Sequence, residues 1–218
     1  MWFQVFLENF TLVSGGLVNP RLSSVWNIPQ LSSADATLSQ STLSIRPATL
    51  EDARALATVL THSFHHYQGT WGWLTPLLRL GVYEDLHHRL KQTKEHHACF
   101  VAAMQTTTTE EIVGTVEISV RYLNALAIAP AKAPYISNLA VNPEYRRLGI
   151  ARKLLARCET QVRYWNYGSV ALHVLENNQA AKQLYLSCGY DIKYAERPLS
   201  AWVLRRPRRL FVQKSLSP

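Results

Sequence analysis

The sequence is poor in the residues that build disulfide and metal frameworks. Its 218 residues include only three cysteines, at positions 99, 158 and 188, and no CxxC pair. An odd number of scattered cysteines excludes a disulfide scaffold and a zinc ribbon, and favours a reducing compartment. Histidine doublets are present, but His62 and His66 lack the glutamate of HExxH, so we expect no metal.

Long hydrophobic runs are also missing. The first 18 residues are apolar, but Gln4, Glu8 and Asn9 interrupt them and no basic segment precedes them. We therefore expect neither a signal peptide nor a transmembrane segment. Residues 1–42 are rich in Ser and Thr and are predicted to form an N-terminal extension, partly flexible. The expected location is cytoplasmic, with the plastid stroma as the alternative.

Acidic side chains are fewer than basic ones: 15 Asp and Glu face 23 Lys and Arg, a net charge of +8. The excess gathers in residues 141–168 and 190–218, which indicates local anion sites rather than specific nucleic-acid binding. The run from Arg205 to Arg209 is predicted either to contact an acidic protein or a larger assembly, or to form a solvated basic hairpin.

From Leu43 onward, the hydrophobic pattern predicts strands alternating with helices. Such an order gives a mixed sheet flanked by helices, so the fold class is α/β (α+β) in one domain spanning 43–218. The expected strands lie near 43–46, 99–104, 112–120, 135–141, 170–174, 190–196 and 209–214. The expected helices lie at 51–65, 83–96, 150–165 and 178–188, and a loop or broken helix is expected at 67–82.

A basic turn joins the strand at 135–141 to the helix that begins near residue 150. It reads Arg146-Arg147-Leu148-Gly149-Ile150-Ala151. Backbone N–H groups at a helix start, the helix dipole and a close-approaching glycine together favour a phosphate or diphosphate. The turn is neither a Walker loop nor GxGxxG, so it does not indicate an ordinary nucleotide site.

Two motifs give a more specific indication. Arg146-x-x-Gly149-x-Ala151 resembles the acetyl-CoA signature R/Q-x-x-G-x-G/A of the GCN5-related N-acetyltransferase (GNAT) superfamily. Downstream, the run from Asn178 to Tyr190 resembles that family's N-x-x-A-x-x-L-Y-x-x-x-G-F/Y. The resemblance covers about 45–214 and implies a mixed seven-stranded sheet, splayed between its fourth and fifth strands and flanked by about four helices.

The resemblance also implies how acetyl-CoA is held. The pantetheine arm would pair with the fourth strand, the turn at 146–151 would hold the pyrophosphate, and a side chain after the fifth strand would bind the arm further along. The expected binding residues are Leu139, Ala140, Val141, Arg146, Arg147, Leu148, Gly149, Ile150, Ala151, Asn178 and Tyr185.

The catalytic groups are expected from the same comparison. Tyr185 would give a proton or hydrogen bond to the sulfur of the leaving coenzyme A. The fourth strand has no glutamate base, but Tyr135 and His173 resemble the pair that acts through water in protein N-terminal acetyltransferases. Glu117, on the preceding strand, is the alternative base acting through water.

The predicted function is transfer of an acetyl group from acetyl-CoA to a primary amine of a protein, at its N-terminus, at lysine or at both. Neither motif contains a catalytic cysteine, so we expect direct attack in a ternary complex. Trp71 and Trp73 would line the acceptor cleft or pack in the core. The alternatives are a small-amine acetyltransferase and a non-catalytic acetyl-CoA-binding module that docks on a larger assembly.

Overall fold

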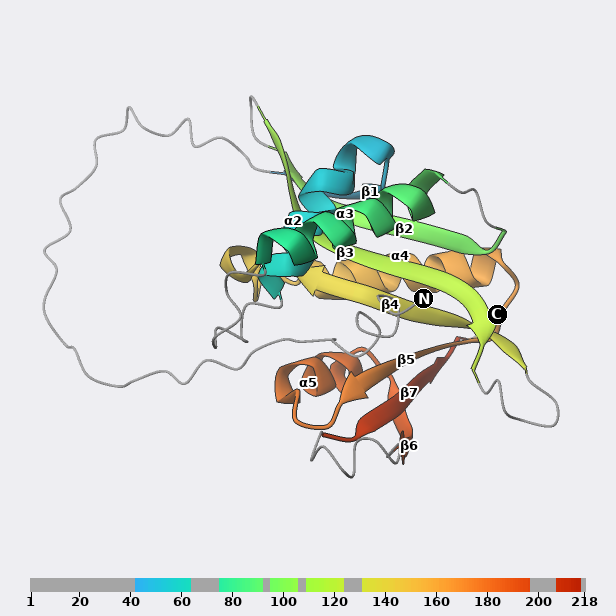
Figure 1. Cartoon of the computed structure of the whole chain (residues 1–218). Helices are drawn as coiled ribbons and strands as arrows, with labels where there is room; N and C mark the ends of the chain where they lie inside the picture. The colour runs from blue at the N-terminus through green and yellow to red at the C-terminus, as the bar shows by residue number, and fades with distance from the viewer. Residues whose placement is uncertain are drawn as a thin grey trace, which may run out of the picture.

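The computed structural model describes residues 42–63, 75–91, 95–105, 109–123, 131–196 and 207–216. Short 3-10 turns precede two of the helices, at Leu50–Asp52 and Pro143–Tyr145. The strands and helices follow in the order β1 (Thr42–Pro47), α2 (Ala53–Ser63), α3 (Thr75–Lys91), β2 (His97–Gln105), β3 (Glu110–Tyr122), β4 (Lys132–Val141), α4 (Ile150–Tyr164), β5 (Ser169–Leu175), α5 (Gln179–Ser187), β6 (Asp191–Glu196) and β7 (Arg209–Ser215) (Figure 1).

The seven strands form one sheet in the order β1-β2-β3-β4-β5-β7-β6. All neighbours run antiparallel except β4 and β5, which are parallel. These two strands pair at a single position, Tyr135 with Ala171, and then diverge (Figure 1). The predicted mixed sheet, splayed between its fourth and fifth strands, is confirmed.

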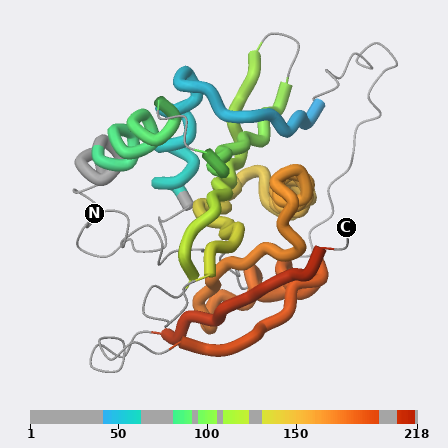
Figure 2. The backbone as a smooth tube through the Cα atoms, turned by 90° about the vertical axis from the view of Figure 1, so that its right-hand side faces the viewer, coloured from blue at the N-terminus to red at the C-terminus, as the bar shows by residue number. Residues whose placement is uncertain are grey.

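Helices cover the two faces of the sheet unequally. The apolar sides of α4 and α5 pack on one face, where Leu154, Cys158 and Tyr185 join side chains of β3, β5 and β7 in the main core. On the other face, α2 and α3 pack against β2, β3 and Ala140 of β4 through residues such as Leu56 and Leu86. In Figure 2 the orange strand β6 and the red strand β7 lie apart from the cyan helix α2 and the green helix α3. Tyr135, Ala171 of β5 and Phe211 of β7 form a separate small cluster on the face of the sheet opposite α4 and α5. The candidate site forms on that face.

Most element positions predicted from the sequence are confirmed within a few residues, but α3 is a correction. Residues 67–82 were expected to be a loop or broken helix, yet the helix begins at Thr75 and ends at Lys91 instead of residue 96. Pro76 belongs to its first turn, where a missing N–H costs nothing, so this proline starts the helix rather than breaking it. The chain then reverses at His96, which has a left-handed φ of 56°.

Several expectations fall outside the described residues: the extension at residues 1–41, the roles of Trp71 and Trp73, and the basic side chains of Arg205 and Arg206. The boundary between extension and domain stays a prediction. Within the described helices, no segment has the length and apolar character needed to cross a bilayer.

Candidate active site

Among the described residues, the divergence of β4 from β5 leaves one backbone edge of β4 without a strand partner. On its other side β4 is paired with β3, with Ala140 opposite Thr115 and Val141 opposite Gly114. Past Tyr135, no residue of β4 is paired with β5. The backbone of Leu139, Ala140 and Val141 therefore lies where an extended, amide-containing chain can add to the sheet.

A bulge shapes this edge of β4. Glu117 lies opposite Ser137 and Thr115 opposite Ala140, so the single β3 residue between them faces two residues of β4. One of the two, Asn138, has a left-handed φ of 53°. Asn adopts this conformation more readily than most residues. The bulge turns the β4 backbone just before the stretch from Leu139 to Val141.

The basic turn between β4 and α4 has the features of an anion-binding loop. Arg147 and Gly149 both have left-handed φ values, of 69° and 76°. Ile150 is fully buried and anchors the start of α4, while Arg147, Leu148 and Gly149 are exposed. The helical hydrogen bonds start with the Lys153 N–H, which donates to the Gly149 carbonyl at 3.1 Å. The N–H groups just before it are therefore available to oxygen atoms of a phosphate.

Arg146 and Ala151 flank this loop on its two sides. The Arg146 Nε donates to the Val141 carbonyl at 3.3 Å, which ties the loop to the end of β4. Ala151 is partly buried against the core, in the first turn of α4. The residues expected to hold the pyrophosphate thus form one continuous loop beside the open edge of β4.

Two further expected residues lie on α5. Asn178 is the N-cap of this helix, and its side-chain oxygen accepts a hydrogen bond from the Ala181 N–H at 3.1 Å. Tyr185 is 2% exposed and packs edge to face against Tyr190, with ring centroids 5.9 Å apart. In the described chain, then, Asn178 shapes the start of α5 and Tyr185 belongs to the core beneath it.

Tyr135 and His173 meet across the point where β4 and β5 separate. The Tyr135 hydroxyl lies 2.8 Å from His173 Nδ1, and both side chains are largely buried. The two residues expected to act together therefore form a hydrogen-bonded pair at the junction of the splayed strands.

Aromatic rings extend this pair along one face of the sheet. The His173 ring packs against Phe211 of β7, with centroids 5.2 Å apart, and Phe211 stacks on Tyr194 of β6 at 4.7 Å. The Arg121 guanidinium lies over the Tyr135 ring, 3.3 Å from its centroid. These neighbours fix the orientation of both rings.

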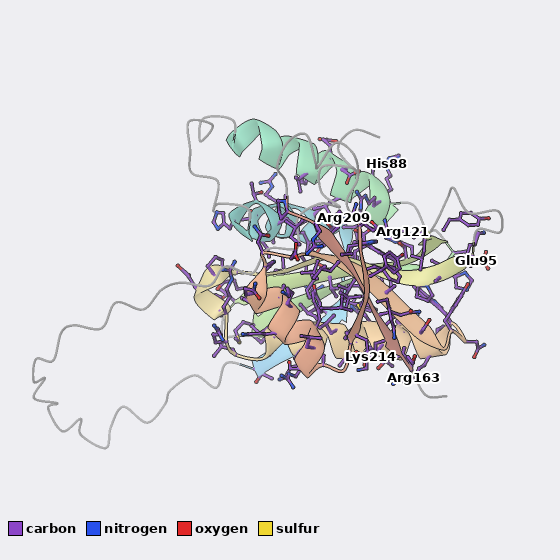
Figure 3. The ribbon with its side chains drawn as sticks, turned by 90° about the horizontal axis from the view of Figure 1, so that it is seen from below. His88, Glu95, Arg121, Arg163, Arg209 and Lys214 are labelled. Atoms are coloured by element: carbon purple, nitrogen blue, oxygen red, sulfur yellow. The ribbon has the colours of Figure 1, made fainter. Side chains whose placement is uncertain are left out.

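His173 is held in its neutral form. Burial and the positive charges of Arg209 and Arg121 lower its pKa, the carboxylate of Glu196 opposes them, and the result is a pKa of about 4. Figure 3 shows Arg121 and Arg209 near the centre of the molecule in this view. A neutral imidazole has one N–H and one lone pair, so His173 can accept a proton at neutral pH.

Glu196 is a site residue that the sequence reasoning missed. It ends β6, and its Oε2 lies 3.2 Å from His173 Nε2. A carboxylate beside Nε2 favours the tautomer that carries the proton there, which leaves the Nδ1 lone pair to accept the hydrogen bond that Tyr135 donates. No local motif marks Glu196. It reaches His173 only because β7 lies between β5 and β6 in the sheet.

Glu117 has a different environment from the one expected. Its carboxylate accepts hydrogen bonds from His97 Nε2 at 2.6 Å, Asn138 Nδ2 at 2.6 Å and Arg89 at 3.0 Å. Burial alone would raise its pKa, but the His97 hydrogen bond and the charge of Arg89 outweigh burial and hold the pKa at about 2. This arrangement does not favour the general-base role expected of Glu117, because so weak a base gives little driving force for proton transfer.

Arg208 and Arg209, the two arginines of the basic run that the structure describes, have different surroundings. Arg208 donates to the Glu176 carboxylate at 2.7 Å, so its charge is paired. Arg209 lies opposite Glu196 in the β6–β7 pairing and contributes to the field at His173. At least this end of the run belongs to the surroundings of the site.

Comparisons with known proteins agree with this geometry. Residues 59–190 match the description "Acetyltransferase (GNAT) family". Over 146 residues the chain is 30% identical to GCN5-related N-acetyltransferase 10, chloroplastic, of Arabidopsis thaliana. This match covers 62% of this chain and 56% of that protein. It is also 26% identical over 154 residues to the uncharacterized N-acetyltransferase YycN of Bacillus subtilis. That match covers 69% of this chain and 93% of YycN.

Solved structures show the same fold. The PaiA N-acetyltransferase of Thermoplasma acidophilum, in complex with coenzyme A, superposes with a TM-score of 0.60 at 16% identity, over 80% of this chain and 99% of that one. The ribosomal-protein-S18-alanine N-acetyltransferase of Escherichia coli superposes with a TM-score of 0.56 at 16% identity, over 81% of this chain and 96% of that one.

The family match spans more than half of the chain and includes both motifs, the splayed strands and the basic loop. The protein belongs to the GNAT acetyltransferase family. The chain spans little more than half the length of the plastid relative described above.

Proposed function

We propose that this protein transfers the acetyl group of acetyl-CoA to a primary amine of a protein, with the N-terminal α-amine as the favoured acceptor. The observation that carries the proposal is the Tyr135 hydroxyl hydrogen-bonded to a neutral His173 at the mouth of the splayed strands. Membership of the family and the anion-binding loop support it.

The chain offers a fitting site for acetyl-CoA, which supplies the acetyl group as a thioester. The N–H groups at the start of α4, with Arg146 and Arg147, would bind the diphosphate. The open backbone edge at Leu139, Ala140 and Val141 would pair with the amide groups of the pantetheine arm. In that arrangement the acyl end would lie beside the bulge of β4, on the side of Tyr135.

Tyr135 and His173 would remove the proton that the amine loses. The attacking nitrogen must be neutral, and it gives up a proton as the new C–N bond forms and the C–S bond breaks. The Tyr135 oxygen would accept that proton, directly or through one water, while its own proton passes to His173 Nδ1. Glu196 would then stabilise the imidazolium at Nε2. Tyr185 is the proposed proton donor to the departing sulfur, on the strength of its position in the second motif.

The weakness of this base favours an α-amine over lysine. His173 has a pKa of about 4, whereas a free α-amine has a pKa of about 8 and a free lysine amine one of about 10.4. At neutral pH, roughly a tenth of α-amines are already neutral, against less than one lysine in a thousand. A base that only assists proton loss therefore suffices for the α-amine, while lysine needs more help.

The test uses the purified protein with acetyl-CoA and three acceptors: a lysine-free peptide with a free N-terminus, an N-terminally blocked peptide with one lysine, and spermidine. Mass spectrometry then locates the acetyl group. We expect the first peptide to react fastest, and Tyr135→Phe and His173→Ala to slow it. Turnover of spermidine alone would establish the small-amine alternative, and acetyl-CoA binding without any turnover would establish a non-catalytic module.

The protein partners and the location are proposed from weaker features. The charge of Arg209 beside the site favours acceptor peptides with acidic side chains near the reacting amine. The match to a chloroplastic N-acetyltransferase of Arabidopsis thaliana favours the plastid stroma over the cytoplasm. Imaging a fluorescent fusion of the full chain in plant cells tests the location, and exclusion of the fusion from plastids would contradict it.

A further inference from the structure

The Glu117 carboxylate is a buried polar group on the α2/α3 face that accepts several hydrogen bonds. Donors reach it from three elements: Arg89 from α3, His97 from β2 and Asn138 from β4. Its side chain is 7% exposed. Arg89 also bonds Asp85, one turn earlier on α3. A buried carboxylate with this many donors is ionised and fixed in position.

The contact with Asn138 connects this cluster to the proposed acetyl-CoA strand. Asn138 is the left-handed residue of the β4 bulge, directly before Leu139 and Ala140. Its Nδ2 donates to Glu117 Oε2 at 2.6 Å, a charge-assisted bond. A left-handed φ is an uphill conformation for any residue other than glycine, so it persists only where the surroundings hold it. The hydrogen bond to Glu117 stabilises Asn138 in this conformation.

We propose that Glu117 is a positioning residue, which fixes Asn138 and the β4 bulge in the backbone conformation that binds the acyl end of acetyl-CoA. This inference rests on the proposed function, because it takes β4 as the acetyl-CoA strand. Glu117 acts through Asn138 and does not itself touch the reacting atoms. Through Arg89 the same carboxylate also joins α3 to the binding strand.

A different explanation is that Glu117 only neutralises the charges of Arg89 and His97. The two explanations differ in what Asn138 does. If the carboxylate only balances charge, loss of the Asn138 bond affects folding stability at most. If it positions the bulge, loss of that bond lowers the population of the binding conformation and weakens acetyl-CoA binding by the same factor.

A double-mutant cycle that exchanges the carboxylate of Glu117 and the amide of Asn138 distinguishes the two explanations. Glu117→Gln removes the carboxylate, Asn138→Asp sets two carboxylates against each other, and the double variant restores an amide-to-carboxylate hydrogen bond with its direction reversed. Calorimetry gives the Kd for acetyl-CoA, and thermal unfolding gives the stability of each variant. Glu159→Gln is the matched control. Glu159 is a buried carboxylate paired with Lys214 at 2.7 Å, on the opposite face of the sheet.

We expect each single variant to raise the Kd about tenfold, and the double variant to return it to within about threefold of the wild type. Glu159→Gln should lower the unfolding temperature without changing the Kd. If Glu117→Gln does not fold, Asn138→Ala serves instead, because alanine removes the Nδ2 donor, leaves every charge paired and, unlike glycine, still needs its surroundings to hold the left-handed backbone. A severalfold weaker Kd is then expected.

Three results would overturn the inference: single variants within twofold of the wild type, a double variant with the summed losses of both, or an Asn138→Ala Kd equal to that of the wild type. Failure of the wild type to bind acetyl-CoA would instead refute the proposed function, and this inference with it. The two failures are therefore distinguishable from the wild-type measurement alone.

Discussion

Replacing His173 with glutamine should remove much of the acid sensitivity of the fold. The structure holds the pKa of His173 at about 4, below its ordinary value of 6.5, because burial and the charges of Arg209 and Arg121 outweigh the carboxylate of Glu196. The unfolded chain therefore binds more protons than the folded chain between these two pKa values. Stability from this group is fully present above pH 6.5 and is lost as the pH falls towards 4.

The size of the effect follows from the two pKa values. Between pH 7 and pH 5, a single group shifted in this way withdraws about 2 kcal/mol of stability. For a domain of this size, 1 kcal/mol corresponds to roughly 2–4 °C in unfolding temperature, so the loss is about 4–8 °C. The side chain of His173 is only 10% exposed, which keeps solvent screening of the effect small.

Thermal unfolding by circular dichroism at pH 7 and pH 5 measures this difference. Wild type and His173→Gln share all other titrating groups, so the variant should lose about 4–8 °C less on acidification. His88→Gln is the control, because His88 is exposed on α3 and should behave as wild type. An equal acid-induced drop in wild type and His173→Gln would show that His173 is not held neutral, and would refute the reasoning.

Three further predictions concern single side chains. Tyr135→Phe should lower kcat about a hundredfold with little change in the KM for acetyl-CoA, because it removes the hydroxyl that bonds His173; steady-state kinetics decide, and a normal kcat would exclude Tyr135 from proton transfer. Gly149→Ala should raise the KM for acetyl-CoA, because a Cβ meets nothing within 4 Å but strains the left-handed φ of 76° by about 1–2 kcal/mol; an unchanged KM would mean that the loop does not bind the diphosphate. Gly114→Ala should lower the unfolding temperature, because the new Cβ would lie 3.2 Å from both the Ala140 carbonyl oxygen and a methyl group of Ile150; an unfolding temperature equal to that of the wild type would show that β3, β4 and α4 separate easily there.

The order of elements was predictable because strand and helix periods are local. The alternation at Leu43 to Arg46 and the repeat of Leu154, Leu155 and Cys158 each depend on a few neighbouring residues, and the structure places both as predicted. The misplaced start of α3 shows the limit of such reading. Proline is a breaker inside a helix and a starter in its first turn, and the sequence around Pro76 does not tell the two apart.

The candidate site was predictable where a motif carries it and unpredictable where the sheet assembles it. The loop from Arg146 to Ala151 and the pair Tyr135 and His173 could be named because they match family patterns. Glu196 could not, because its contact with His173 depends on the order β5-β7-β6. The environment of Glu117 likewise depends on partners 20 to 28 residues away in sequence, which no local pattern specifies.

The most direct test of the account is one mass-spectrometric experiment on both reactants. The purified protein is incubated with acetyl-CoA and a lysine-free peptide that has a free N-terminus, and the intact masses of peptide and protein are recorded over time. The account predicts one acetyl group on the α-nitrogen of the peptide and no acetylated protein at any time. An unmodified peptide, or an acetyl group that appears first on the protein, would contradict it.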